Sequence, residues 1–277
     1  MIIGLSDILH TLIASVLSRK YKLPYIVDLY DNFESFGLAM IPGLKRLFQY
    51  AIKDADGISV VSPELKNYVI EKYKPNSRIT VIENAVDAKA FYPMDKVSMR
   101  KIFKLPEKGI FIGMAGALSE TRGISILFKA YLELLNNYDD IFLVLAGPIN
   151  KKSKLPKCSN ILYLGVLPYS EIPAFLNTLD IGVILNKDDA FGKYCFPQKY
   201  YEMLSCKLPI VASRVGVMSR VLSETPEILF DPADSKSLVA AIETQLDNKF
   251  NINAEVFTWD NQSKKFASMV NDVISTQ

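Results

Sequence analysis

Lys199 and Glu202 are the charged residues whose spacing most directly indicates chemistry. Three residues apart on a helix, an ammonium group and a carboxylate lie on one face. An ammonium group binds anions, and a carboxylate accepts hydrogen bonds from two neighbouring hydroxyls. Pro197 suits the first turn of such a helix, and the apolar run Leu208–Ala212 is typical of a buried parallel strand. The pair is therefore expected at the carboxyl edge of a sheet; a surface ion pair worth about 0.2–0.5 kcal/mol is the alternative.

Arg122 is a second candidate for anion binding. It follows a strand and a glycine-containing turn, and it directly precedes Gly123 and a helix with apolar Ile124, Leu127 and Tyr131. The first amides of a helix lack partners within the helix, and the helix dipole is positive at that end. The cation and these amides are therefore expected to converge on one phosphate. A solvated arginine of the first helical turn is the alternative.

The elements that position these residues alternate along the whole chain. Apolar runs typical of buried strands are separated by helical patterns. This alternation predicts the α/β class, with parallel sheets and right-handed crossovers. The predicted strands are Tyr25–Leu29, Gly57–Val61, Ile79–Ile82, Ile110–Ala115, Ile141–Ala146, Ile161–Leu164, Ile181–Leu185, Pro209–Ala212 and Ile228–Phe230.

Four motifs, in order, carry a resemblance to a known family. Ile79–Asp87 with Phe91–Pro93 resembles an interdomain hinge of the type I-P-N-G-V-D followed by F-x-P. Gly116–Leu127 resembles a phosphate loop, Glu202–Ala212 a nucleotide-sugar site, and Phe257–Trp259 the start of a last helix. Together they resemble the retaining nucleotide-sugar glycosyltransferases of GT-B architecture, glycosyltransferase family 4 or glycosyl transferases group 1. The resemblance implies two Rossmann-like domains facing a cleft.

The motifs divide the chain into three parts. Residues 1–90 are expected to form a partial acceptor-side Rossmann-like domain, residues 91–256 the nucleotide-sugar-binding domain, and residues 257–277 a helix packing back towards the first domain. About 90 residues before the hinge are few for a Rossmann-like half of ordinary domain size. The N-terminal domain is therefore predicted to be incomplete, with a late start, a natural remnant or a companion chain as the possible reasons.

The resemblance assigns roles to residues of the donor site. The donor is a nucleoside-diphosphate sugar, with no other cofactor and no metal. Its diphosphate is expected to contact Gly116, Arg122, Gly123 and Lys199, its ribose Glu202, and its sugar or base the loop residues Tyr194, Phe196, Pro197, Gly165, Val166 and Leu167. On the acceptor side, Tyr30, Asp31 and Asn84 are expected to line the cleft.

Three positions depart from the family pattern. Ala117 replaces one of two phosphate-binding cations, Tyr194 replaces a glutamate that meets the donor sugar, and Tyr30 replaces a histidine. The single histidine of the sequence, His10, lies in an amphipathic stretch, where a packed or surface position is expected rather than a catalytic role. No catalytic residue is therefore assigned.

Composition narrows the class of partners. A net charge of +2 over 277 residues gives no field that favours nucleic acid. Three cysteines without metal-ligand spacing are typical of reduced thiols in a cytoplasmic protein. An apolar and basic stretch suggests peripheral contact with the inner face of a membrane, with ordinary core packing as the alternative; its residues are Phe33, Phe36, Leu38, Met40, Ile41, Leu44, Lys45, Arg46, Phe48 and Tyr50.

The leading interpretation is a hexosyltransferase-type enzyme. It would move a sugar from a nucleoside-diphosphate sugar to a glycan or lipid-linked acceptor in cell-surface polysaccharide synthesis, with retention of configuration. A second interpretation is a non-catalytic nucleotide-sugar-binding partner of a split transferase. A third is a sugar-nucleotide epimerase, which needs catalytic carboxylates and a histidine that the sequence does not place.

Overall fold

The protein is a two-unit α/β structure. The computed structural model describes residues 1–5, 7–35, 39, 41–150 and 153–276. Unit 1 comprises Met1–Ala85, Asp189–Phe196 and Phe257–Gln277, and unit 2 comprises Val86–Asp188 and Pro197–Val256. Every neighbouring pair of strands is parallel, which confirms the predicted α/β class.

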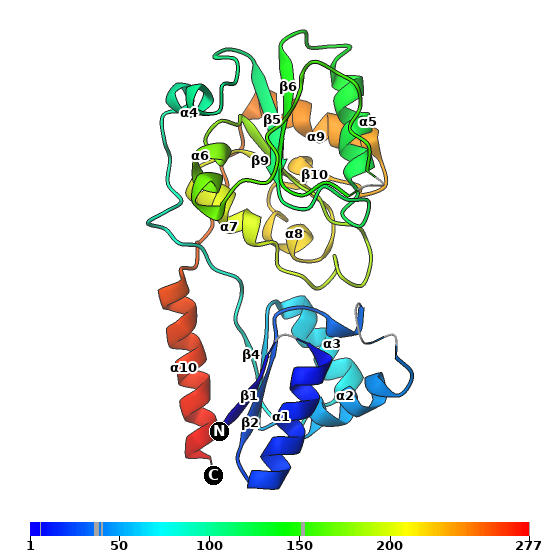
Figure 1. Ribbon diagram of the computed structural model, residues 1–277, viewed down its shortest axis with the longest axis vertical. Coiled ribbons are helices and arrows are strands. Elements are labelled where there is room, and N and C mark those ends of the chain that lie inside the picture. Colours follow the sequence, from blue (N-terminus) through cyan, green and yellow to red (C-terminus); the bar gives the residue numbers. More distant parts are fainter. Residues whose placement is uncertain (6, 36–38, 40, 151–152, 277) are drawn as a thin grey trace. The chain divides into compact units, whose positions relative to one another are not determined.

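Unit 1 is built on a sheet of order β1-β2-β3-β4. Its strands are β1 (Ile2–Gly4), β2 (Tyr25–Leu29), β3 (Gly57–Val60) and β4 (Ile79–Val81), and its helices are α1 (Ile8–Tyr21), α2 (Leu44–Lys53), α3 (Pro63–Tyr73) and α10 (Trp259–Ser275), with a 3-10 turn η1 at Phe33–Ser35. Helices α1, α2 and α3 lie on one face of the sheet and α10 on the other (Figure 1).

Helix α10 is held to the sheet by an apolar contact. Met269 and Val273 form a buried cluster with Ile26 of β2. A Cβ atom on Gly57 would lie 2.8 Å from Val273, so glycine at this position lets the helix approach β3 closely. The side chain and main chain of Thr258 and Asn261 form a reciprocal capping box that begins the helix.

Unit 2 contains a sheet of order β10-β9-β8-β5-β6-β7. Its strands are β5 (Ile110–Ala115), β6 (Ile141–Ala146), β7 (Ile161–Tyr163), β8 (Ile181–Ile184), β9 (Ile210–Ser213) and β10 (Leu229–Phe230), and its helices are α4 (Lys96–Ile102), α5 (Ile124–Leu134), α6 (Ile172–Leu176), α7 (Gln198–Ser205), α8 (Gly216–Val221) and α9 (Ser235–Asn248), with 3-10 turns η3 (Tyr169–Glu171) and η4 (Pro226–Ile228).

The order of the strands in unit 2 reverses at β5. From β5 the chain proceeds outward through β6 and β7, and it then crosses back to build β8, β9 and β10 on the other side. In open parallel sheets, ligands bind beyond the carboxyl ends of the strands where the order reverses. The loops that follow β5 and β8 are therefore the first place to look for a site.

The predicted strands match the observed ones closely. Their ends agree within one residue, and most of the differences shorten a strand at an end where pairing is incomplete. Strand β1 was not predicted, because a three-residue strand at the start of the chain carries too short a pattern.

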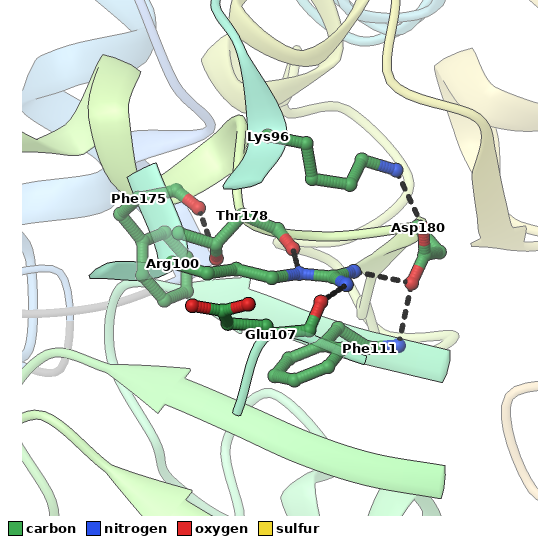
Figure 2. A network of polar contacts seen from close by, with 7 residues as sticks. All are labelled: Lys96, Arg100, Glu107, Phe111, Phe175, Thr178 and Asp180. Carbon is green, nitrogen blue, oxygen red and sulfur yellow. Dashed lines mark hydrogen bonds and ion pairs between the residues drawn. The ribbon is translucent and has the colours of Figure 1, made fainter. Parts of the chain in front are cut away.

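An ion-pair network around the buried Arg100 side chain fixes α4 to the amino ends of β5 and β8 (Figure 2). The guanidinium of Arg100, which is 5 % exposed, donates to the carbonyls of Thr178 at 3.0 Å and Glu107 at 3.1 Å and to the carboxylate of Asp180 at 2.8 Å. Asp180 also accepts from Lys96 at 2.5 Å and from the amide of Phe111 at 2.8 Å. The buried guanidinium of Arg100 therefore has a hydrogen-bond acceptor for each of its three nitrogen atoms.

Asp180→Ala is expected to lower the free energy of unfolding by about 2–4 kcal/mol, because it leaves the Arg100 charge buried without its carboxylate. Urea unfolding measures this. A matched control is Lys101→Ala, also on α4, whose ion pair with Glu107 spans 3.5 Å between side chains that are 63 % and 61 % exposed; its effect should stay below about 1 kcal/mol. Equal effects of the two substitutions would contradict the structural role of the network.

Candidate functional site

The ammonium group of Lys199 lies directly over Gly116, at the carboxyl end of β5. Gly116 has a φ of 122°, and a Cβ atom there would approach Lys199 Nζ too closely and would lie 2.8 Å from Lys199 Cε. Because glycine leaves this space open, the lysine reaches the main chain of the turn. Lys199 belongs to the first turn of α7, and Pro197 occupies the N-cap position of that helix.

Two further glycine turns lie beside Gly116. Gly147 follows β6 with a φ of 127°, and Gly165 follows β7 with a φ of 75°. The amide of Gly147 donates to the Gly165 carbonyl at 2.7 Å, and the amide of Gly116 donates to the Ala146 carbonyl at 2.8 Å. A Cβ atom on Gly147 would collide with the main chain of Gly116. The three turns therefore pack main chain against main chain at one edge of the sheet.

Arg122 and Asn186 join the loops on either side of the position where the strand order reverses. Arg122 Nη1 donates to Asn186 Oδ1 at 3.2 Å, and Asn186 follows β8. The main-chain N–H of Asn186 donates to the hydroxyl of Ser213, at the end of β9, at 3.0 Å. Asn186 is 4 % exposed, and its buried Nδ2 has no partner among the described residues. Gly123 is the N-cap of α5 with a φ of 86°, and the helix begins at Ile124, two residues after Arg122.

Glu202 lies on α7 and is 6 % exposed. Burial raises the pKa of its carboxyl above the usual value, while the charge of Lys199 and hydrogen bonds from Tyr169 and Gln198 offset part of that rise. The alternative prediction, that Glu202 takes part only in a surface ion pair, is therefore wrong, because its carboxylate is buried. A buried carboxylate next to a cation is a group poised to accept hydrogen bonds from a ligand.

Tyr169 lies beside Glu202, and Val166 and Leu167 precede Tyr169 in the same loop. Val166 is 70 % exposed and Tyr169 is 53 % exposed. Burial raises the pKa of the Tyr169 hydroxyl, and the nearby Glu202 charge raises it further. Tyr169 and Asn186 were not selected from the sequence. The sequence offered two signals that could have indicated them. Tyr169 comes four residues after Gly165, and Asn186 directly follows a predicted buried strand.

The remaining donor-loop candidates divide between the units. Tyr194 and Phe196 belong to unit 1, and Pro197 is the first residue of unit 2 after them. The ring of Tyr194 lies 4.6 Å, centre to centre, from the ring of Tyr68 on α3. Within unit 2 the structure thus brings Lys199 to Gly116 and Glu202, while Arg122 of the same unit contacts Asn186.

Unit 1 contains a cavity of about 470 Å³ at the carboxyl ends of β2, β3 and β4 and the start of α10. Its lining residues are Asp28, Tyr30, Val61, Ile82, Glu83, Asn84, Trp259, Gln262, Ser263 and Phe266. Burial raises the pKa of Asp28, while the hydroxyl of Ser59, donating at 2.5 Å, offsets part of that rise. Tyr30 and Asn84 line this cavity, whereas Asp31 is not among its lining residues.

Metal ligands do not gather in either unit as far as the structure describes it: there is no group of three or more histidine, cysteine, aspartate or glutamate side chains. His10 is exposed in the first turn of α1, where Asp7 caps the helix and contacts the imidazole at 2.9 Å.

The two parallel α/β units define a protein of GT-B fold. The structure resembles that of sucrose-phosphate synthase from Thermosynechococcus elongatus. The match has a TM-score of 0.78 and 15 % identity, and it covers 98 % of this chain and 73 % of that one. HepE of Anabaena, in complex with UDP and glucose, gives a TM-score of 0.77 and 17 % identity over 96 % and 76 %.

The chain belongs to the glycosyl transferases group 1 family, whose model matches residues 95–264. An uncharacterized glycosyltransferase of Methanocaldococcus jannaschii is 25 % identical over 76 % of this chain and 54 % of its own length. The D-inositol 3-phosphate glycosyltransferase of Corynebacterium urealyticum is 22 % identical over 86 % of this chain and 62 % of its own length. This chain therefore spans between a half and two thirds of these two curated relatives.

Proposed function

We propose that the protein transfers a sugar from a nucleoside-diphosphate sugar to a glycan or lipid-linked acceptor in cell-surface polysaccharide synthesis. The observation that carries the proposal is the position of Lys199 over Gly116 at the reversal of strand order, with Arg122 and Glu202 in the same unit. The names of related proteins support it: one is an N-acetyl-alpha-D-glucosaminyl L-malate synthase and another an O-antigen biosynthesis glycosyltransferase.

In this proposal unit 2 binds the donor. Lys199, Arg122 and the first amides of α5 bind the diphosphate, and the Glu202 carboxylate accepts hydrogen bonds from the two ribose hydroxyls. Gly165, Val166, Leu167 and Tyr169 lie beside the base. HepE, a protein of the same fold, has been solved with UDP-glucose, which supports a nucleotide-activated sugar as the donor.

The proposed reaction retains the configuration of the anomeric carbon. The bond between that carbon and the diphosphate oxygen breaks, and its electron pair passes to the diphosphate. The acceptor hydroxyl forms the new bond on the same face and gives its proton to the leaving diphosphate. Lys199 and Arg122 stabilise the charge that develops on this leaving group, a preorganised electrostatic contribution. No residue is assigned as an acid or base.

We place the acceptor against unit 1. Exposed aromatic rings suit the apolar faces of sugars, while carboxylate and amide groups suit their hydroxyls. The cavity of unit 1 offers both kinds of group: Tyr30 is 49 % exposed and Trp259 is 52 % exposed, and Asp28 and Asn84 line the same space. Asp31 belongs to the same loop as Tyr30.

The proposal is tested by incubating the protein with UDP-glucose and other sugar nucleotides and following release of the nucleoside diphosphate. Proton NMR of the first-formed sugar product should show the same anomer as the donor. Nucleotide binding without sugar release or transfer would favour the non-catalytic partner of a split transferase. Interconversion of two sugar nucleotides would indicate an epimerase.

We also propose peripheral contact with the inner face of the cytoplasmic membrane. Ile41, Leu47 and Tyr50 are 48 %, 54 % and 51 % exposed, beside the exposed cations Lys45 and Arg46. Phe33 and Phe48, included in the predicted membrane stretch, are each 2 % exposed and pack in the core of unit 1 instead. Phe36, Leu38 and Met40 lie outside the described residues. Within the described chain, no helix is long and apolar enough to cross a bilayer.

Liposome flotation measures this contact. The protein is expected to float with vesicles containing anionic lipid, and Leu47→Asp with Tyr50→Asp should abolish flotation, because both replace exposed apolar area with charge. Leu132→Asp on α5, a leucine that is 45 % exposed elsewhere in the chain, is the matched control and should float normally. Failure of the unaltered protein to float would remove the proposal.

A further inference from the structure

Residues 189–196 leave unit 2 after β8 and return immediately before α7, yet they cluster with unit 1. The chain thus passes from one unit to the other between Asp188 and Asp189 and back again between Phe196 and Pro197. The returning end leads directly into the helix that carries Lys199 and Glu202. What holds this segment therefore bears on the donor site proposed above.

Three side chains of unit 1 hold the segment by its main-chain carbonyls. The Ser62 hydroxyl donates to the Tyr194 carbonyl at 2.8 Å, and the Asn84 amide donates to the Phe196 carbonyl at 2.6 Å. The Asn32 amide reaches the Ala190 carbonyl at 3.4 Å. These three residues follow β3, β4 and β2, respectively. Three strand ends of one sheet therefore anchor eight consecutive residues.

The segment is a compact turn in its own right. The carboxylate of Asp189 accepts from the amides of Phe191 at 3.0 Å and Gly192 at 2.8 Å. The amides of Lys193 and Cys195 donate to the carbonyls of Asp189 and Phe191, both at 3.0 Å. Because the turn is closed internally, a hold at Tyr194 and Phe196 fixes the whole segment rather than one residue.

The Phe196 carbonyl is separated by one residue from Gln198, where α7 begins. Lys199 and Glu202 follow within one turn of that helix. We propose that Ser62 and Asn84 are positioning residues of the donor site, which act by fixing the main chain that leads into α7. This inference rests on the proposed function, since it concerns the same nucleotide-sugar site.

Ser62 offers a substitution that separates this role from folding. Its hydroxyl also caps α3 by accepting from the Leu65 amide at 3.0 Å. Ser62→Asp keeps an N-cap acceptor but removes the donor to Tyr194, whereas Ser62→Thr keeps both functions. Asn84→Ala removes the second anchor without adding charge, so agreement between Ser62→Asp and Asn84→Ala excludes an effect of the new carboxylate.

The alkylation rate of Cys195 measures how firmly residues 189–196 are held, and this measurement needs no ligand. Cys195 is 6 % exposed, and Cys206 at the end of α7 is 5 % exposed, while Cys158 is half-buried. Alkylation by iodoacetamide, read peptide by peptide by mass spectrometry, should label Cys195 about threefold to tenfold faster in Ser62→Asp and Asn84→Ala, as the loss of one hydrogen bond implies. Cys206 and Cys158 should keep their rates, and Ser62→Thr should match the unaltered protein.

Titration with UDP-glucose, UDP, GDP-mannose and GDP gives the second readout. For the nucleotide that the unaltered protein binds, both anchor-deficient variants should lose about threefold to tenfold in affinity, and Ser62→Thr should lose none. Unchanged Cys195 labelling would overturn the anchoring, and faster labelling with unchanged affinity would overturn the positioning role. If the unaltered protein binds no nucleotide, the proposed function fails and the positioning role with it, a result distinct from either of these.

Discussion

Glu202→Ala is expected to weaken binding of the nucleoside diphosphate by about 10-fold to 100-fold, the cost of losing hydrogen bonds to a charged group. The carboxylate is buried on α7 beside Lys199, where water competes poorly for it. Isothermal titration measures the loss. Inorganic pyrophosphate, which has no ribose, should bind the variant and the unaltered protein equally.

The ribose assignment has a sharper control. A 2′,3′-dideoxynucleoside diphosphate lacks the hydroxyls that Glu202 is proposed to bind, so the unaltered protein should bind it as weakly as Glu202→Ala binds the full nucleotide. In Glu202→Ala the two nucleotides should bind alike. If the variant still prefers the ribonucleotide by the original factor, Glu202 does not contact the ribose.

The same carboxyl gives a dependence on pH. Because burial raises its pKa in the folded protein, Glu202 becomes protonated at a higher pH than an ordinary glutamate, and nucleotide affinity should fall as pH is lowered through that raised value. Glu202→Gln should remove this dependence. For stability the sign is opposite: the contribution of Glu202 is fully present below the pKa of the unfolded chain and is lost as pH rises through the folded value.

Gly116→Ala is expected to be the second large effect, because the added methyl group would occupy the place of the Lys199 side chain. With the ammonium displaced, affinity for pyrophosphate and nucleoside diphosphates should fall by about 10-fold or more, as for a lost charged hydrogen bond. A φ of 122° also disfavours any residue with a side chain, and such strain costs on the order of 1–3 kcal/mol in stability.

Two controls separate displacement of Lys199 from backbone strain. Gly43→Ala, at a φ of 88° with no described atom within 4 Å of the new Cβ, carries strain alone and should leave anion binding unchanged. In a Lys199→Ala background, Gly116→Ala should have little further effect on pyrophosphate binding, since coupled residues are not additive. Additive losses would mean that Gly116 acts independently of Lys199.

The sequence predicts the parallel sheets well because buried strands leave continuous apolar runs, as in Ile110–Ala115 and Ile141–Ala146. It also predicts that Lys199 and Glu202 share a helix face, since that depends on local spacing. The burial of Glu202 could not be read from the same spacing, because it depends on Tyr169 and on packing by distant elements.

The residues that sequence reasoning missed act across long separations. Asn186 meets Arg122 from 64 positions away, and Ser62 reaches Tyr194 from 132 positions away. A serine before Pro63 reads only as a helix cap, which it also is. Nothing in the local pattern of residues 189–196 indicates that they cluster with unit 1 rather than with their neighbours in the chain.

Calorimetric titration of the protein with UDP, GDP and ADP, repeated on Glu202→Ala and Arg122→Ala, tests directly whether unit 2 binds a nucleotide donor. We expect at least one nucleoside diphosphate to bind and both substitutions to weaken its binding by about 1–3 kcal/mol. Only Arg122→Ala should also weaken the binding of pyrophosphate. Well-folded protein that binds none of the three nucleotides, or binding that neither substitution changes, would contradict a donor site at the carboxyl ends of β5 and β8.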